Sequence, residues 1–190
     1  MAAGKKRIGV LALQGDFEAH EKALQRAGAE AVEVRSAKQL RDVDALVIPG
    51  GESTTMLKLI ATEQMFEPLK RFGETHPVFG TCAGAILVAS EVTNPAQESL
   101  GLMDIGVERN GYGRQLDSRI AQVTGEGIEN LEAEFIRAPV IRRVGENAKV
   151  LARYQGDPVL VEQGRHLVAT FHPELTSDPR VHQLFLEKVQ

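Results

Sequence analysis

Short apolar runs alternate with helix-like segments through the first half of the chain, and this alternation restricts the possible folds more than any other feature. IGVLAL at residues 8–13 and ALVI at 45–48 are apolar throughout, as in strands that are buried on both faces. PVF at 77–79 is a shorter run, and AVEV at 31–34 alternates as a half-buried strand does. Segments with helical character follow these runs at residues 18–27, 54–73 and 83–90. Strands and helices in this order predict βαβ units, and therefore a parallel sheet with right-handed crossovers.

Local signals indicate where the helices begin and end. Gly28 is placed to end the first helix, and Ser53 stands at the expected N-cap of the second. Pro68 is expected to divide residues 54–73 into two shorter helices. A last helix is expected to open near Pro179 and to run to residue 188.

The second half of the chain has a different character. From about residue 104 to 171, short strand-like pieces are separated by turns that contain glycine. We expect these pieces to add antiparallel strands at one edge of the sheet. The prediction is therefore α/β, a single three-layer domain over residues 1–190. It has a mostly parallel central sheet with helices on both faces and added antiparallel strands in the second half.

Charge and cysteine content narrow the choice of partners. The formal net charge is -4, which argues against a nucleic-acid partner because such a partner usually requires a basic face. One cysteine cannot form an internal disulfide, so the chain suits a reducing compartment. No stretch approaches the ~18 consecutive apolar residues of a membrane span. We expect a cytoplasmic protein with no membrane partner.

The single cysteine lies in VFGTCAG, where an expected strand turns into an expected helix. Gly80 and Gly84 stand two positions on either side of Cys82, as in the G-x-S-x-G turn that exposes a nucleophile. The N-terminal end of the following helix would stabilise a thiolate. Free cysteine more often packs as a small buried hydrophobe, and that interpretation also stands. The glycines favour a nucleophile.

A thiol nucleophile needs a base, and His172 is the best-placed histidine. It closes the last expected strand, in FHPELT, and Glu174 follows two residues later. Since ligands collect at the carboxyl ends of parallel strands, Cys82 and His172 should emerge at one edge of the sheet. Glu174 could then fix the imidazole tautomer. The alternative is a strand-ending turn with a solvated acid. The other histidines are expected in helices as surface or packing residues, in a loop, or at the far end of a strand: His20, His182, His76 and His166.

PGGEST at residues 49–54 follows another buried strand. Its glycines would place backbone N–H groups at the carboxyl edge, where Gly51 and Ala83 could form an oxyanion hole. A phosphate-binding loop is disfavoured because neither G-x-G-x-x-G nor G-x-x-x-x-G-K-[ST] is present. A tight turn that caps a helix is compatible with the catalytic interpretation.

These motifs together resemble the triad-type (class I) glutamine amidotransferase family, whose fold is flavodoxin-like. The likeness includes LALQGDF, LGLMDI, VERNGYGRQ at 107–115 and FIRAP at 135–139. With these motifs the resemblance covers nearly the whole chain. The full set of motifs is similar to that of the glutaminase subunits of pyridoxal 5′-phosphate synthase complexes. The resemblance implies hydrolysis of L-glutamine to glutamate and ammonia. It makes Cys82 the nucleophile, His172 the base and Glu174 the group that orients the histidine. It implies substrate contacts at Gly51, Glu52, Ser53, Arg109, Ile136 and Arg137.

The resemblance also implies partners. Ammonia would pass to a barrel-shaped synthase subunit, docking would improve the oxyanion hole, and the chemistry would use no metal and no organic cofactor. Two other functions remain open. One is a different hydrolase on a similar scaffold, such as a cysteine peptidase or a γ-glutamyl hydrolase. The other is a non-enzymatic binding module with an inert buried cysteine. Arg109 and Arg137 favour the glutaminase, because a guanidinium can pair with the carboxylate of an amino acid.

Overall fold

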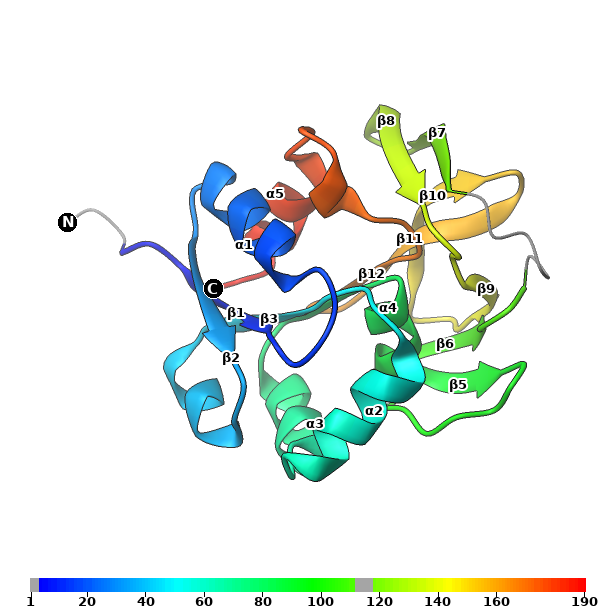
Figure 1. The fold of residues 1–190 in the computed structure, drawn as a ribbon. Coiled ribbons are helices and arrows are strands. Elements are labelled where there is room, and N and C mark those ends of the chain that lie inside the picture. The colour runs from blue at the N-terminus through cyan, green and yellow to red at the C-terminus, as the bar shows by residue number, and fades with distance from the viewer. Residues whose placement is uncertain (1–3, 112–117) are drawn as a thin grey trace.

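The computed structural model describes residues 4–111 and 118–190, and within them the strands form two sheets (Figure 1). The last four residues of VERNGYGRQ therefore lie outside the described residues. The larger sheet has nine strands in the order β2-β1-β3-β4-β12-β11-β10-β7-β8. The first five of these are parallel to one another: β2 (Glu30–Val34), β1 (Arg7–Leu11), β3 (Ala45–Ile48), β4 (Val78–Thr81) and β12 (His166–Ala169).

Antiparallel strands extend this sheet at one edge, as the turn-rich second half predicted. They are β11 (Asp157–Gln163), β10 (Lys149–Tyr154), β7 (Arg119–Gly125) and β8 (Ile128–Phe135). A smaller sheet, which the sequence did not predict, joins β5 (Ala89–Thr93), β6 (Met103–Glu108) and β9 (Val140–Val144).

Helices cover both faces of the large sheet (Figure 1). One face carries α1 (Phe17–Arg26) and α5 (Arg180–Glu187), whose Leu24 and Phe185 pack against the sheet. The other carries α2 (Ser53–Thr62), α3 (Phe66–Thr75), α4 (Ala83–Val88) and the short 3-10 helix η1 (Ala37–Asp42). A second 3-10 turn, η2 (Pro173–Leu175), follows β12.

Alternate residues of the parallel strands enter opposite cores. Val47 of β3 packs with α1 and α5, and its neighbours Leu46 and Ile48 pack with α2 and α3. Both faces are buried, which explains why these strands are continuous apolar runs. The predicted α/β class, with a parallel centre and added antiparallel strands, is confirmed.

The prediction of two shorter helices across residues 54–73 is confirmed, but the place of the break and two other local predictions were wrong. The break between α2 and α3 lies at residues 63–65, where Gln64 has a φ of 54°, and Pro68 lies in the first turn of α3. A proline is tolerated there because first-turn N–H groups have no helical acceptor. Glu52, rather than Ser53, caps α2, since its carboxylate accepts hydrogen bonds from the N–H groups of Thr54 and Thr55. The helix expected over 83–90 ends at Val88, and the next residues form β5.

No helix within residues 4–111 and 118–190 has the length and apolar character needed to cross a membrane.

Candidate active site

Cys82 occupies the sharp turn between β4 and α4. Its φ of 50° and ψ of -109° fall in a region that residues with a side chain rarely adopt. Its N–H donates to the carbonyl of Ala169 in β12 over 2.8 Å, which ties the turn to the neighbouring strand. The N–H of Ala83 opens the helix and therefore has no acceptor within it. The turn places the buried Cys82 thiol beside a backbone N–H that makes no hydrogen bond within the helix.

Both glycines of the turn are required by close backbone contacts. A Cβ on Gly80 would overlap the carbonyl of Gly84, and a Cβ on Gly84 would overlap the carbonyl oxygen of Ile48 in β3. The helix therefore begins in direct contact with two strands. The glycine spacing around the cysteine follows from this packing.

The structure brings Cys82 and His172 together. Strand β12 is parallel to β4, with Ala169 opposite Thr81, so the residues that follow the two strands leave the sheet at the same edge. Gly50, after β3, lies between them. A Cβ on Gly50 would stand 2.5 Å from Cε1 of His172 and 3.3 Å from Cβ of Cys82. A larger residue at position 50 would push into this pair.

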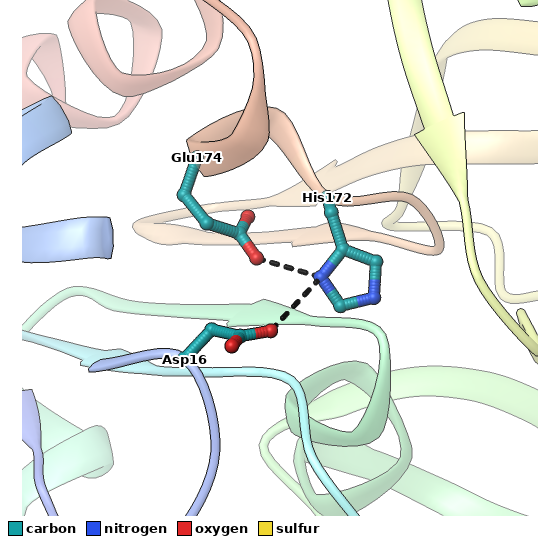
Figure 2. Close-up of side chains that lie close together, drawn as sticks. All are labelled: Asp16, His172 and Glu174. Atoms are coloured by element: carbon teal, nitrogen blue, oxygen red, sulfur yellow. Dashed lines mark hydrogen bonds and ion pairs between the residues drawn. The ribbon is translucent and has the colours of Figure 1, made fainter. Parts of the chain in front are cut away.

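Glu174 lies behind the imidazole, on the turn η2. Its Oε1 accepts a hydrogen bond of 2.6 Å from Nδ1 of His172. Asp16 lies farther away, with Oδ2 3.9 Å from the same nitrogen. Figure 2 shows both carboxylates on the Nδ1 side of the ring, which leaves Nε2 directed away from them. The bond to Glu174 places the proton on Nδ1, because a carboxylate can only accept it.

The surroundings of His172 favour its protonated form. Burial alone would lower the pKa of this imidazole, but hydrogen bonds to Cys82 and Glu174, together with their charges, raise it to about 10. The imidazole thus lies between two groups that stabilise its positive charge. A thiolate beside an imidazolium is the reactive state of a cysteine nucleophile.

The acidic cluster around His172 is also close enough to hold a cation. One ligand atom each from Asp16, His172 and Glu174 lies within 4.8 Å of the others. An ion that used Nδ1 would have to displace the hydrogen bond to Glu174. The arrangement therefore suits proton chemistry better than metal binding.

The PGGEST loop lies against the loop that follows β1. The N–H of Asp16 donates to the carbonyl of Gly50, and the N–H of Glu52 donates to Oε1 of Gln14 over 3.0 Å. The hydroxyl of Ser53 is buried and donates to Oε1 of Gln97. Gly51 is exposed and lies against the side chain of Gln14.

Arg109 and Glu52 place opposite charges at the N-terminus of α2. The Arg109 guanidinium donates to the hydroxyl of Thr54 over 2.7 Å and lies 3.7 Å from the Glu52 carboxylate. A hydrogen bond from the Thr55 hydroxyl, with others from the backbone of Thr54 and Thr55, lowers the pKa of Glu52 to about 2. Glu52 is therefore anionic at neutral pH.

Ile136 and Arg137 follow β8 beside the thiol. In its thiol form, Cys82 donates through Sγ to the carbonyl oxygen of Ile136 over 3.7 Å. Arg137 is exposed and has a φ of 45°, in the left-handed region that is unfavourable for a residue with a Cβ. The backbone, rather than the side chain, of this segment makes the contact with the cysteine.

Sequence reasoning gave no role at this edge to Gln14, Asp16 or His20. Gln14 and Asp16 belong to LALQGDF and follow β1, so their position after a buried strand was the available signal. His20 was expected to be a surface or packing residue of a helix, but its side chain is fully buried and contacts Thr81 and Glu174. Amphipathic periodicity alone does not predict that contact.

Known proteins are similar in sequence to this chain over nearly its whole length. The model of the SNO glutamine amidotransferase family matches residues 10–190. A Solibacter usitatus protein named pyridoxal 5′-phosphate synthase subunit PdxT is 64% identical, over 97% of this chain and 100% of that protein. The protein of the same name from Koribacter versatilis is 55% identical, over 97% of this chain and 96% of its own length.

Solved structures agree with these matches. A crystal structure of a glutamine amidotransferase is 49% identical to this chain, with a TM-score of 0.90 over 96% of this chain and 98% of the other. The PurLQS structure from Thermotoga maritima, at 17% identity and a TM-score of 0.71, shares the fold. On the family match and these near full-length relatives, the chain belongs to the SNO glutamine amidotransferase family.

Proposed function

We propose that this chain is a glutaminase domain over residues 1–190 that hydrolyses L-glutamine to L-glutamate and ammonia, with Cys82, His172 and Glu174 as a catalytic triad. The observation that carries the proposal is the position of His172. Its Nδ1 is bonded to Glu174, and its ring lies beside Cys82 around Gly50. An imidazole with a pKa raised to about 10 by these two neighbours can hold a proton next to a thiolate.

The reaction proceeds through a thioester. The thiolate of Cys82 attacks the side-chain amide carbon of glutamine, and the N–H groups of Gly51 and Ala83 stabilise the tetrahedral oxyanion. The intermediate collapses with cleavage of the C–N bond, and the His172 imidazolium donates its proton to the leaving ammonia. His172 then takes a proton from water, whose oxygen attacks the thioester. Glutamate leaves, and the thiolate and imidazolium are restored.

Arg109 and Glu52 provide charges that match a free amino acid. The Arg109 guanidinium would pair with the substrate α-carboxylate, and the anionic Glu52 would accept the α-ammonium group. Ser53, Ile136 and Arg137 would complete the contacts, with Ile136 acting through its backbone. A peptidase would have no need of paired charges for both ends of an amino acid.

Ammonia is useful only if it reaches an acceptor before it is protonated in water. The relatives from Solibacter usitatus and Koribacter versatilis are named as subunits of a pyridoxal 5′-phosphate synthase. This chain would therefore deliver ammonia to a barrel-shaped synthase subunit for vitamin B6 synthesis, and docking would complete the oxyanion hole. The glutaminase step itself needs neither a metal nor an organic cofactor.

The proposal is tested by an electrophilic glutamine analogue, 6-diazo-5-oxo-L-norleucine, with intact-mass and peptide mass spectrometry. We expect one adduct, on Cys82, that forms faster in the presence of the synthase subunit. Excess L-glutamine should protect Cys82, and iodoacetamide should show that the thiol is reachable. An absence of the adduct with the partner present, or an adduct on another residue, would refute the proposal.

A further inference from the structure

A line of buried polar side chains continues behind Glu174. Nε2 of His20 lies 3.4 Å from Oε2 of Glu174 and 3.0 Å from the hydroxyl of Thr81. Nδ1 of the same ring lies 3.0 Å from Nε2 of His182 on α5. All four side chains are buried, with His20 and His182 fully inaccessible. The line thus joins α1 and α5 to the segments that follow β4 and β12, in which Cys82 and His172 lie.

Hydrogen-bond counting selects one tautomer of each histidine. Within the described residues, Oε2 of Glu174 and Nδ1 of His182 have no hydrogen-bond partner. If His20 carried its proton on Nδ1, His182 would bury an unpaired N–H, and the bare Nε2 of His20 would face the Glu174 carboxylate. If His20 carries its proton on Nε2, that N–H faces Glu174 and Thr81, and His182 donates to Nδ1. The second arrangement leaves a bare ring nitrogen on His182 without a donor and turns the His20 N–H towards Oε2 of Glu174 in an attractive contact. This costs less than a buried unpaired N–H together with a repulsive contact.

Burial keeps both rings uncharged. It lowers the pKa of His20 well below the ordinary value, and the charges of His182 and His172 lower it further. Burial and the nearby Arg26 lower the pKa of His182 to about 4. A neutral donor can hold a carboxylate in place without cancelling its charge. The negative charge of Glu174 therefore remains available to the imidazolium of His172, which also lies near Asp16 and Cys82.

We propose that His20 is a positioning residue whose Nε2–H, hydrogen-bonded to Thr81, attracts Oε2 of Glu174 across 3.4 Å and so keeps this carboxylate against His172, and that His182 fixes the His20 tautomer. This inference rests on the proposed function, because the group being positioned is the third member of the triad. Loss of the donor would free the Glu174 carboxylate to rotate. The support for the His172 imidazolium would weaken.

The test uses two near-isosteric substitutions, His20→Leu and His20→Gln, in the complex with the synthase subunit. Leucine removes the donor, while the glutamine amide can place an N–H close to the position of Nε2. Residues that orient a metal-ligating histidine typically contribute roughly ten- to a hundredfold to activity, and we take the same range for a residue that orients the triad carboxylate. We expect His20→Leu to lower kcat by this amount with little change in KM, and His20→Gln to retain most of the activity.

Alkylation of Cys82 by iodoacetamide supplies a readout that a purely structural role would not move. The chain has one cysteine, so the reagent reports on this thiol alone. In His20→Leu, the rate at neutral pH should fall, and the alkaline limit at which His172 loses its proton should move to lower pH. His76→Leu is the matched control, since His76 stacks on Phe72 of α3 rather than joining the buried line.

The variants distinguish the possible failures. Equal losses in His20→Leu and His20→Gln would mean that packing, rather than the donor, matters, and would overturn the inference. Should His20→Leu not fold, His182→Leu carries the test, because it leaves His20 without a fixed tautomer and must lower kcat. Wild-type turnover in His182→Leu would then reject the inference. If His172→Asn behaves as the wild type, the proposed function fails. If His172→Asn loses activity but His20→Leu keeps wild-type turnover, the proposed triad is retained and only the positioning role of His20 is refuted.

Discussion

His172 and Glu174 are separated by one proline and share a buried hydrogen bond of 2.6 Å between Nδ1 and Oε1. The turn η2 folds the glutamate back beneath the imidazole, and the side chain of Glu174 is inaccessible to solvent. The pair fixes which ring nitrogen carries the proton. It leaves the other nitrogen for chemistry at the thiol, and the following predictions depend on this geometry.

Replacement of His172 by asparagine should abolish most of the activity. Members of a catalytic triad act as a unit, so turnover in the complex should fall by several orders of magnitude, up to about 10⁶-fold. The fold should stay intact, as checked by circular dichroism, although the variant loses the contribution of the His172 imidazolium to stability. His76→Asn serves as the control, because His76 lies at the end of α3. Retained turnover in His172→Asn would show that another group is the base.

Replacement of Glu174 by glutamine should lower the pKa of His172 below its value of about 10. The glutamate raises this pKa by hydrogen bonding and by charge, so its loss destabilises the imidazolium. The His172 ring resonances, followed by NMR over a pH titration, give the value directly. Asp16→Asn should cause a smaller change, since that carboxylate is 3.9 Å away and half exposed. Equal shifts in the two variants would contradict the assignment of Glu174.

Replacement of Gly84 by alanine should destabilise the protein. The new Cβ would overlap the carbonyl of Ile48, so α4 would have to move away from β3. Forcing extra atoms into a packed region costs about 1–3 kcal/mol. Urea unfolding measures the loss, and iodoacetamide labelling of Cys82 should slow as well. Gly4→Ala is the control because, apart from Gly4 and its chain neighbours, no heavy atom of the described residues lies within 4 Å of its Cβ position. Similar stabilities of the two variants would disprove this close contact.

Replacement of Arg109 by lysine should weaken glutamine binding. Lysine keeps the charge but loses the planar fork that pairs with a carboxylate. The KM for glutamine should rise by about tenfold with a smaller change in kcat, as for a group that contributes to substrate binding. Arg143→Lys, at an arginine that pairs with Asp104 and Glu91, is the matched control. An unchanged KM in Arg109→Lys would remove this residue from the substrate site.

Acid should destabilise the protein through its buried histidines. The pKa values of His166 and His182 are lowered to about 4 by burial, and that of His20 is also lowered. The unfolded chain therefore binds protons below about pH 6.5 that the folded chain excludes. The contribution of these three histidines to stability is complete above about pH 6.5 and is lost as the pH falls towards about 4. Each histidine contributes up to about 1.4 kcal/mol per pH unit within this window.

His172 acts in the opposite direction, and its effect falls in a different range. Because its folded pKa is raised, its contribution is complete below about pH 6.5 and is lost as the pH rises towards 10. Unfolding free energies in urea from about pH 7 to about pH 5 isolate the acid effect. His182→Leu should show a shallower dependence than the wild type. If the unfolding free energies of His182→Leu and the wild type depended equally on pH, protonation of His182 would not contribute to the loss of stability in acid.

Local sequence patterns predicted the secondary structure correctly where a pattern is compatible with only one kind of element. Continuous apolar runs become strands only when both faces are covered, and the order of strands and helices then requires parallel pairing. Patterns with two solutions failed. The apolar residues after Cys82 suit a helix or a strand equally, and the pairing of Ala89 with Met103 decides that a strand begins there. Pro68 was misleading because a proline in a first turn does not break a helix.

The sequence by itself determined the α/β class, the glycine-flanked turn at Cys82 and the chain positions of the histidine and the glutamate, because each depends on neighbouring residues. Only the tertiary structure decided that these groups meet. Their contact depends on the parallel register of β4 and β12, which lie far apart along the chain. The same holds for His20, which looked like an ordinary helical residue until α1 packed over the end of β4 and α5 placed His182 against it. Burial and neighbours that are distant in the sequence set the protonation of these side chains. The local pattern of apolar and polar residues predicts neither of them.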